Sequence, residues 1–169
     1  MKQGTGLSNI LAGNKKYTTN GNGNFTATGG DIINYPETGQ VDFIAYYPFS
    51  TAINGTRLDF NVTDQSNLAK IDVMYSDNAK NLGKNSGPAS LEFAHKLTKI
   101  ELIVKAGTGV NNLTGLRTAY NNVPTTSSMD LPSGAISAGT NNANINAKVT
   151  AQNADQFVEA ILIPGNYSA

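Results

Sequence analysis

Few side chains in this sequence have the type and spacing that catalysis needs. The only histidine, His95, follows Phe93 in an alternating stretch, and we expect a strand residue hydrogen-bonded to a neighbouring carbonyl. No Gly-x-Ser-x-Gly nucleophile elbow accompanies it. The sequence has no cysteine, which excludes disulfides, zinc–thiolate sites and cysteine nucleophiles.

The acidic residues are scattered as well. Asp64, Asp72 and Asp77 lie near one another in the sequence, but a glycosidase would need two carboxylates about 5–9.5 Å apart across a cleft. Their spacing does not match an EF-hand calcium loop. We expect these residues at caps, turns and solvated strand positions. The sequence therefore predicts no catalytic residue, no metal site and no cofactor, and an enzyme with an Asp/Glu pair is the least favoured alternative.

The densest aromatic cluster is Tyr46-Tyr47-Pro48-Phe49. Aromatic rings of this kind can stack on sugar faces, although packing in a core or at a strand end is the simpler role. Tyr46 and Tyr47 are therefore the candidate contacts for a ligand or an adhesion partner. The glycine-rich stretches Gly21–Gly23 and Gly29–Gly30 lack the spacing of phosphate-binding loops, and we predict turns there.

The composition is typical of an exported all-β protein. The chain has 169 residues, with 12 Lys+Arg and 12 Asp+Glu, which disfavours a cationic nucleic-acid binder or a polybasic membrane-surface protein. Charged residues make up 14% of the chain, against roughly 25% in ordinary domains. Neutral polar and turn-forming residues replace them, with 22 Asn, 17 Thr, 11 Ser and 17 Gly. The chain starts without an apolar signal segment, so we expect a mature or trimmed form.

Short strands separated by turn residues dominate the pattern. A hairpin is predicted from Lys15–Thr19 to Asn24–Thr28, and Val41–Tyr47 is predicted as a central strand buried largely on both faces. Arg57–Val62 alternates cleanly, and Asp64–Lys70 is predicted as one short helix with Asp64 as its N-cap. Further strands are predicted at Ile71–Tyr75, Leu91–His95, Leu97–Ala106, Gly115–Asn121, Ser127–Leu131, Ala143–Thr150 and Gln156–Ile163.

These elements predict one β-sandwich domain over residues 1–169, with about seven or more strands and one short helix. In Leu97–Ala106, the face with Ile100, Leu102 and Val104 is expected to join Ala160 and Leu162 in the apolar core between facing sheets.

Several blocks of sequence, taken in order, resemble the fimbrillin-like family of the Bacteroidetes, which are subunits of surface fimbriae. The blocks that carry this resemblance are VDFIAYYPFS (Val41–Ser50), DQSNLAKIDVMYSDNA (Asp64–Ala79), LEFAHKLTKIELIVKAGTG (Leu91–Gly109), LTGL (Leu113–Leu116), TTSSMDLPSGAIS (Thr125–Ser137) and EAILIP (Glu159–Pro164).

The resemblance implies a transthyretin-like, Greek-key β-sandwich equivalent to the N-terminal domain of such a subunit. It also implies export by the lipoprotein route, a precursor anchored by lipid to the outer membrane, and maturation by proteolysis. Because the sequence shows neither the lipoprotein signal nor a second, C-terminal sandwich, we expect it to be a fragment equivalent to the N-terminal domain. In this family a strand from a neighbouring subunit fills a groove, so the implied partners are other fimbrial subunits joined by strand addition.

Two functions of different kinds remain. The first is a non-enzymatic structural subunit of cell-surface fimbriae that acts in adhesion to host surface proteins or glycans. The second is a stand-alone, surface-located glycan-binding module that uses Tyr46 or Tyr47. The first predicts an open sheet edge, and the second predicts an exposed aromatic platform.

Overall fold

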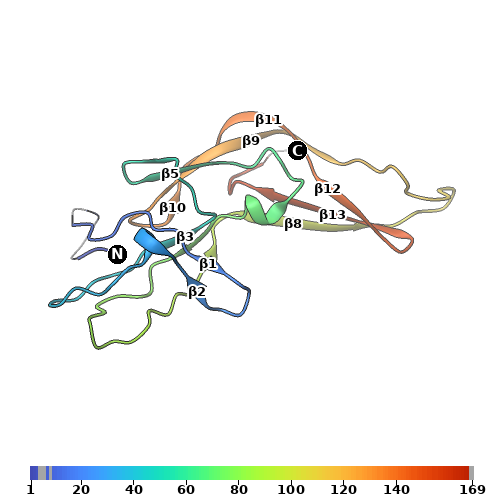
Figure 1. Ribbon diagram of the computed structural model, residues 1–169. Coiled ribbons are helices and arrows are strands. Elements are labelled where there is room, and N and C mark those ends of the chain that lie inside the picture. Colours follow the sequence, from blue (N-terminus) through green and yellow to red (C-terminus); the bar gives the residue numbers. More distant parts are fainter. Residues whose placement is uncertain (4–6, 8, 168–169) are drawn as a thin grey trace.

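The computed structural model describes residues 1–3, 7 and 9–167, and within them the chain is built from strands with almost no helix (Figure 1). Two single-turn 3-10 helices, η1 (Gly29–Asp31) and η2 (Leu68–Lys70), accompany the strands. The strands are β1 (Thr18–Thr19), β2 (Phe25–Thr26), β3 (Ala45–Tyr47), β4 (Ile53–Asn54), β5 (Arg57–Asn61), β6 (Met74–Ser76), β7 (Ala94–His95), β8 (Thr98–Val104), β9 (Ala119–Asp130), β10 (Ala135–Ile136), β11 (Thr140–Asn146), β12 (Lys148–Gln152) and β13 (Asp155–Leu162).

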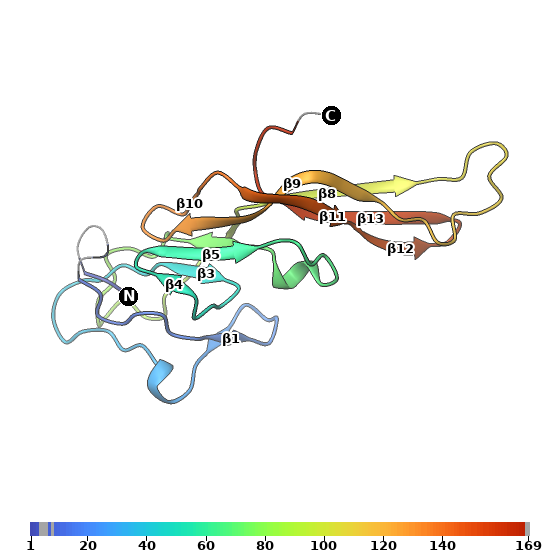
Figure 2. The ribbon, with the colours of Figure 1, turned by 90° about the horizontal axis from the view of Figure 1, so that it is seen from above.

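One layer is organised around the long strand β9. Its antiparallel order is β10-β9-β5-β4, and β11 also pairs with β9. The second layer contains two three-stranded antiparallel sheets, β3-β6-β7 and β12-β13-β8. The chain passes almost directly from the first of these sheets to the second, because β7 ends at His95 and β8 begins at Thr98. Between them, the Lys96 N–H donates to the Val73 carbonyl at 2.8 Å. Figure 2 shows β8, β13 and β12 running alongside β9 and β11.

Apolar side chains fill two adjoining clusters between these layers. One contains Val62, Val123, Ile145, Ala160, Leu162 and Ile163, and the other contains Leu58, Val73, Tyr75, Met129 and Leu131. Phe60, Leu97 and Ile136 contact both clusters. The burial of Ala160 and Leu162, at 0% and 2% exposure, confirms their predicted place in the core.

Local patterns predicted several elements correctly. The hairpin between β1 and β2 forms, with Thr18 opposite Thr26 and the Asn-Gly turn between them. In β5 and the residue after it, Leu58 and Val62 are buried while Arg57, Asp59 and Asn61 are exposed, as the alternation predicts.

The predicted strands Gly115–Asn121 and Ser127–Leu131 are replaced by the single twelve-residue strand β9. Pro124, which has no N–H for a ladder, lies inside it, opposite Asn142 of β11 and outside the stretch that pairs with β5. The long strand therefore accommodates a residue that usually interrupts one.

The predicted helix at Asp64–Lys70 is wrong in extent. The chain makes only the 3-10 turn η2, and Asn67 occupies its N-cap position without a side-chain bond. The Asp64 carboxylate instead accepts the Ser66 N–H at 2.9 Å, which closes a local turn over the three residues Asp64–Ser66. The side chain of Gln65 is then buried at 3% exposure and bonded to β13, which holds this segment against the sheet rather than in a helix.

The predicted central strand Val41–Tyr47 is also wrong in part. Val41 is buried and bridges Leu82, but only Ala45–Tyr47 forms a strand, and that strand is the edge of its sheet. Tyr47 is 37% exposed, and no strand of the described residues pairs beyond this edge.

Leu102 is not in the core. It is 48% exposed, and its neighbour Ile103 is 58% exposed. The strand β8 is the edge of its sheet, and Figure 1 shows this end of β8 and the β12–β13 hairpin reaching past the ends of β9 and β11. The facing layer therefore does not cover the side chain that periodicity places on the apolar face.

Candidate functional site

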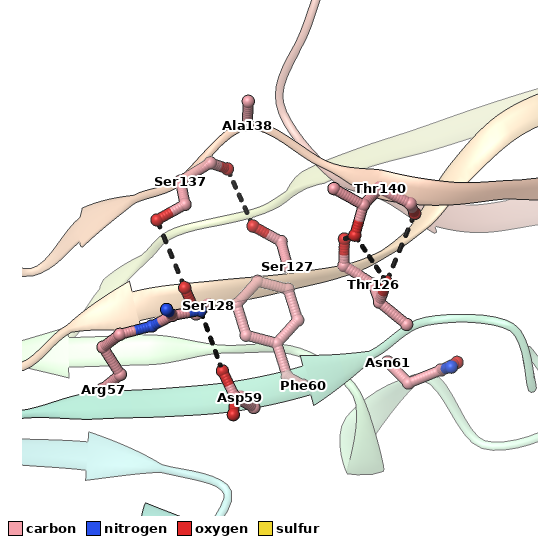
Figure 3. Close-up of a pocket in the computed structure, with 10 residues that line it drawn as sticks. All are labelled: Arg57, Asp59, Phe60, Asn61, Thr126, Ser127, Ser128, Ser137, Ala138 and Thr140. Carbon is pink, nitrogen blue, oxygen red and sulfur yellow. Dashed lines mark hydrogen bonds and ion pairs between the residues drawn. The ribbon is translucent and has the colours of Figure 1, made fainter. Parts of the chain in front are cut away.

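A hollow of about 480 Å³ lies over the outer surface of β5 and β9, and five of its ten lining residues carry hydroxyl groups (Figure 3). The Ser127 hydroxyl donates to the Ser137 carbonyl at 2.7 Å, and the Thr126 and Thr140 hydroxyls are 3.0 Å apart. Arg57 and Asp59 at its end form an ion pair at 3.4 Å. These polar groups bond to one another, so the hydroxyls serve mainly to join β9 to the segment from Ser137 to Thr140.

A second hollow, of about 390 Å³, has three aromatic residues, Tyr47, Phe49 and Phe60, in its lining, and we call it the Tyr47 hollow. Three separate segments form it, namely residues 47–50, 58–61 and 70–73 without Asp72. Tyr47 is 37% exposed and Phe49 is 38% exposed, so both rings remain accessible to solvent. The Lys16 ammonium lies 5.8 Å from the centroid of the Phe49 ring, within range of a cation–π contact.

Backbone groups of β5 contribute a polar wall to the Tyr47 hollow. Just before β5, the Thr56 carbonyl accepts the Leu131 N–H at 2.8 Å, and just after it the Val62 N–H donates to the Thr125 carbonyl at 2.8 Å. Along an antiparallel strand the N–H and C=O groups of successive residues point to opposite sides. The backbone groups of Leu58 and Phe60 therefore bond β9. Asp59 and Asn61 point the opposite way, and β4 pairs only as far as Leu58. No strand among the described residues pairs with this part of β5.

The two tyrosines predicted as contacts occupy different surroundings. Tyr46 packs against the core cluster of Leu58 and Val73. Its hydroxyl donates to the Ser50 carbonyl at 3.0 Å and also bonds Asn14, and burial raises its pKa. Tyr47 is one of the residues that line the hollow named after it, and its hydroxyl makes no hydrogen bond with the described residues. The structure thus brings Tyr47 together with Phe49, which the sequence left unassigned, and directs Tyr46 to the interior.

The outer edge of β8 is a second open feature. Ile161 lies opposite Lys99 in the β13–β8 ladder, and its N–H and carbonyl bond the Gln65 side chain at 2.8 and 3.0 Å. Opposed residues in an antiparallel ladder either bond each other or both point away, so the backbone of Lys99 faces outward. The same holds for Glu101 and Ile103. No other strand of the described residues pairs with this edge.

Charged side chains lie along the β8 edge. Lys99 bonds Glu101 at 2.5 Å and Glu159 at 2.9 Å, and these hydrogen bonds, that of Glu101 first, raise the pKa of Lys99. Charges on an edge strand oppose indiscriminate pairing with other strands. An added strand must therefore match both the charges and the exposed Leu102 and Ile103.

The remaining candidates for chemistry do not converge. His95 bonds a carboxylate, that of Asp72, at 2.9 Å, which corrects the expected carbonyl partner, and no serine or threonine hydroxyl bonds its ring in the described part of the chain. Asp77 pairs with Lys80 at 3.2 Å, and Asp64 belongs to its local turn. Over residues 1–3, 7 and 9–167, no group of three His, Cys, Asp or Glu side chains could hold a metal ion.

None of the helices in the described residues is long and apolar enough to cross a membrane.

Comparison with known proteins finds two similar proteins of Bacteroides uniformis. The "Putative fimbrium subunit Fim1C" of Bacteroides uniformis is 33% identical over 130 residues, which are 72% of this chain and 43% of that protein. A crystal structure of "a putative cell adhesion protein" from Bacteroides uniformis superposes with a TM-score of 0.81 at 28% identity, over 93% of this chain and 64% of that one. The chain therefore spans less than half of the first relative and under two thirds of the second.

The profile of the fimbrillin-like proteins matches residues 1–169, the full length of the sequence. This match confirms the resemblance carried by the ordered blocks from Val41 to Pro164. On this evidence, the chain belongs to the fimbrillin-like family.

Proposed function

We propose that this chain is part of a structural subunit of cell-surface fimbriae, acts in cell adhesion and carries no enzymatic activity. The observation that carries the proposal is the match of the fimbrillin-like family to the whole chain. The descriptions of the two relatives, which name a fimbrium subunit and a cell adhesion protein, support it. The scattered positions of His95 and the acidic residues are consistent with a function in assembly and contact rather than in bond chemistry.

The proposal includes the place of the chain in a larger subunit. Residues 1–169 would form one transthyretin-like, Greek-key sandwich equivalent to the N-terminal domain, with a precursor anchored by lipid to the outer membrane. The partial coverage of both relatives, 43% and 64%, supports a domain of a longer protein. Its partners would be other fimbrial subunits and, in adhesion, host surface proteins or glycans.

Assembly would proceed by strand exchange at the β8 edge. Lys99, Glu101 and Ile103 turn their backbone groups outward, so an incoming strand could bond three successive positions of this ladder. Covering Leu102 and Ile103, now 48% and 58% exposed, would add apolar burial to the backbone bonds. The ion pairs of Lys99 would restrict which strand can pair there.

Proline at Glu101 tests this edge. Because the Glu101 N–H points away from β13, Glu101→Pro removes an outward donor and keeps the bonds between β8 and β13. Glu101→Gln is the matched control, since it removes the same charge and keeps the N–H. Light scattering on a size-exclusion column, over a hundredfold range of concentration, measures association of the chain and both variants.

We expect the parent chain and Glu101→Gln to associate increasingly with concentration, and Glu101→Pro to stay monomeric with an unchanged circular dichroism spectrum. A parent chain that is monomeric throughout would contradict strand addition between copies. Equal association by the proline variant would move the interface to another edge.

A further inference from the structure

We propose that the Tyr47 hollow is a saccharide-binding site, in which a sugar ring stacks on Tyr47 or Phe49 and its hydroxyls bond the backbone of Asp59 and Asn61 and the ammonium of Lys70. This inference goes beyond the proposed assembly, because the hollow borders β5 and residues 47–50 and does not include the β8 edge. It holds whether or not subunits exchange strands.

The aromatic wall is the first argument. Tyr47 and Phe49 are each more than one third exposed, although large rings normally gain by burial. Tyr46, the preceding residue of β3, shows the alternative, since its ring packs against the core and its hydroxyl bonds Ser50. Tyr47 thus combines a partly exposed ring with a hydroxyl that has no hydrogen-bond partner in the described residues, and both can serve a ligand.

The polar wall is the second argument. The outward N–H and carbonyl groups of Asp59 and Asn61 supply donors and acceptors side by side, on a strand fixed by its ladder with β9. Lys70 lines the same hollow, and no carboxylate of the described residues lies within 4 Å of its ammonium. A rigid wall with both kinds of hydrogen-bonding group matches hydroxyls, which donate and accept.

The combination of these walls selects the class of ligand. A wholly apolar ligand would remove the backbone groups of Asp59 and Asn61 from water without replacing their hydrogen bonds. An added strand could pair only with the three residues from Asp59 to Asn61, between the end of the β4 pairing and the end of β5, which is shorter than the usual strand of about 5–6 residues. A sugar has an apolar ring face, a rim of hydroxyls and a size suited to a hollow of about 390 Å³.

Saturation-transfer NMR on the full chain tests this site, because it detects weak binding. The probes are galactose, glucose, mannose, fucose, N-acetylglucosamine, N-acetylgalactosamine and sialic acid, each alone and as a disaccharide. The variants are Tyr47→Ala and Phe49→Ala, with Tyr17→Ala as the control. Tyr17 is also 37% exposed but does not line the hollow, so it matches Tyr47 in type and exposure.

We expect transfer to ring protons of at least one probe, a loss of affinity of about tenfold or more in Tyr47→Ala or Phe49→Ala, and no loss in Tyr17→Ala. Thermal melts by circular dichroism show whether each variant stays folded. Transfer to none of the probes would overturn the proposal, and so would binding that survives both Tyr47→Ala and Phe49→Ala.

A different occupant gives a different result. If a strand of a second copy fills the hollow, Tyr47→Ala would abolish concentration-dependent association while no sugar binds, which overturns the saccharide site. Failure of the β8 edge is separate, because it is read from Glu101→Pro, a variant outside the hollow.

Discussion

The exposure of Leu102 gives the sharpest test of the structure. Leu102 in β8 and Leu162 in β13 lie on adjacent strands of one sheet, but they are 48% and 2% exposed. Truncation of either leucine to alanine removes the same atoms. The two variants therefore differ only in how well the rest of the molecule covers the side chain.

The expected magnitudes follow from this burial. Leu162→Ala should lower the free energy of unfolding by about 2–5 kcal/mol, through lost burial and the cavity that remains. Full burial of a leucine contributes about 1.5–3 kcal/mol, so half burial of Leu102 predicts a loss of about 1 kcal/mol and little cavity. In a domain of this size each kcal/mol lowers the melting temperature by about 2–4 °C.

Urea unfolding followed by circular dichroism at 25 °C, with thermal melts as a second measure, compares the two variants under conditions where the chain is monomeric. Equal losses for Leu102→Ala and Leu162→Ala would refute the reasoning, because Leu102 would then be covered. The β8 edge would not be open, and the proposed strand acceptor would fail with it. In samples where the chain associates, Leu102→Ala should lower the stability more than it does in the monomer, because a strand added to β8 would cover Leu102.

Three other predictions concern the packing around the core. Gly134→Ala should lower the free energy of unfolding by more than about 2 kcal/mol, because φ is +65° and a Cβ there would lie 2.5 Å from the Tyr75 ring. Gly55→Ala is the control, since Gly55 has a φ of +62° with open space around it, and it should lower the free energy of unfolding by about 1 kcal/mol. Urea unfolding compares the two variants. Burial, followed by the charges of Asp77 and Asp130, raises the pKa of Tyr75 to about 12. The folded state therefore loses stability as the pH rises from the ordinary value near 10 toward 12, and Tyr75→Phe should reduce that loss in alkaline melts; an unchanged alkaline transition would contradict the assignment. Gln65→Ala should lower the free energy of unfolding by about 2–4 kcal/mol, because the Ile161 N–H and carbonyl and the Val62 carbonyl would lose hydrogen bonds of 2.6–3.0 Å. A loss below about 1 kcal/mol in urea unfolding would show that another group replaces the Gln65 amide.

Local sequence determined the elements that depend on neighbours in the chain. The Asn-Gly turn fixes the β1–β2 hairpin, and alternation assigns Leu58 and Val62 of the β5 segment to the interior. The order of the blocks from Val41 to Pro164 was by itself enough to indicate the fimbrillin-like family.

Tertiary structure decided which of these apolar faces and strand edges are covered. Alternation placed Leu102 and Leu162 on the same kind of face, but only Leu162 has the facing layer over it. The Tyr47 hollow exists because three separate segments meet beside the short strand β4, and no local pattern reports where a partner strand ends. Periodicity records the preference of each side chain for burial, whereas exposure depends on contacts between residues far apart in the chain.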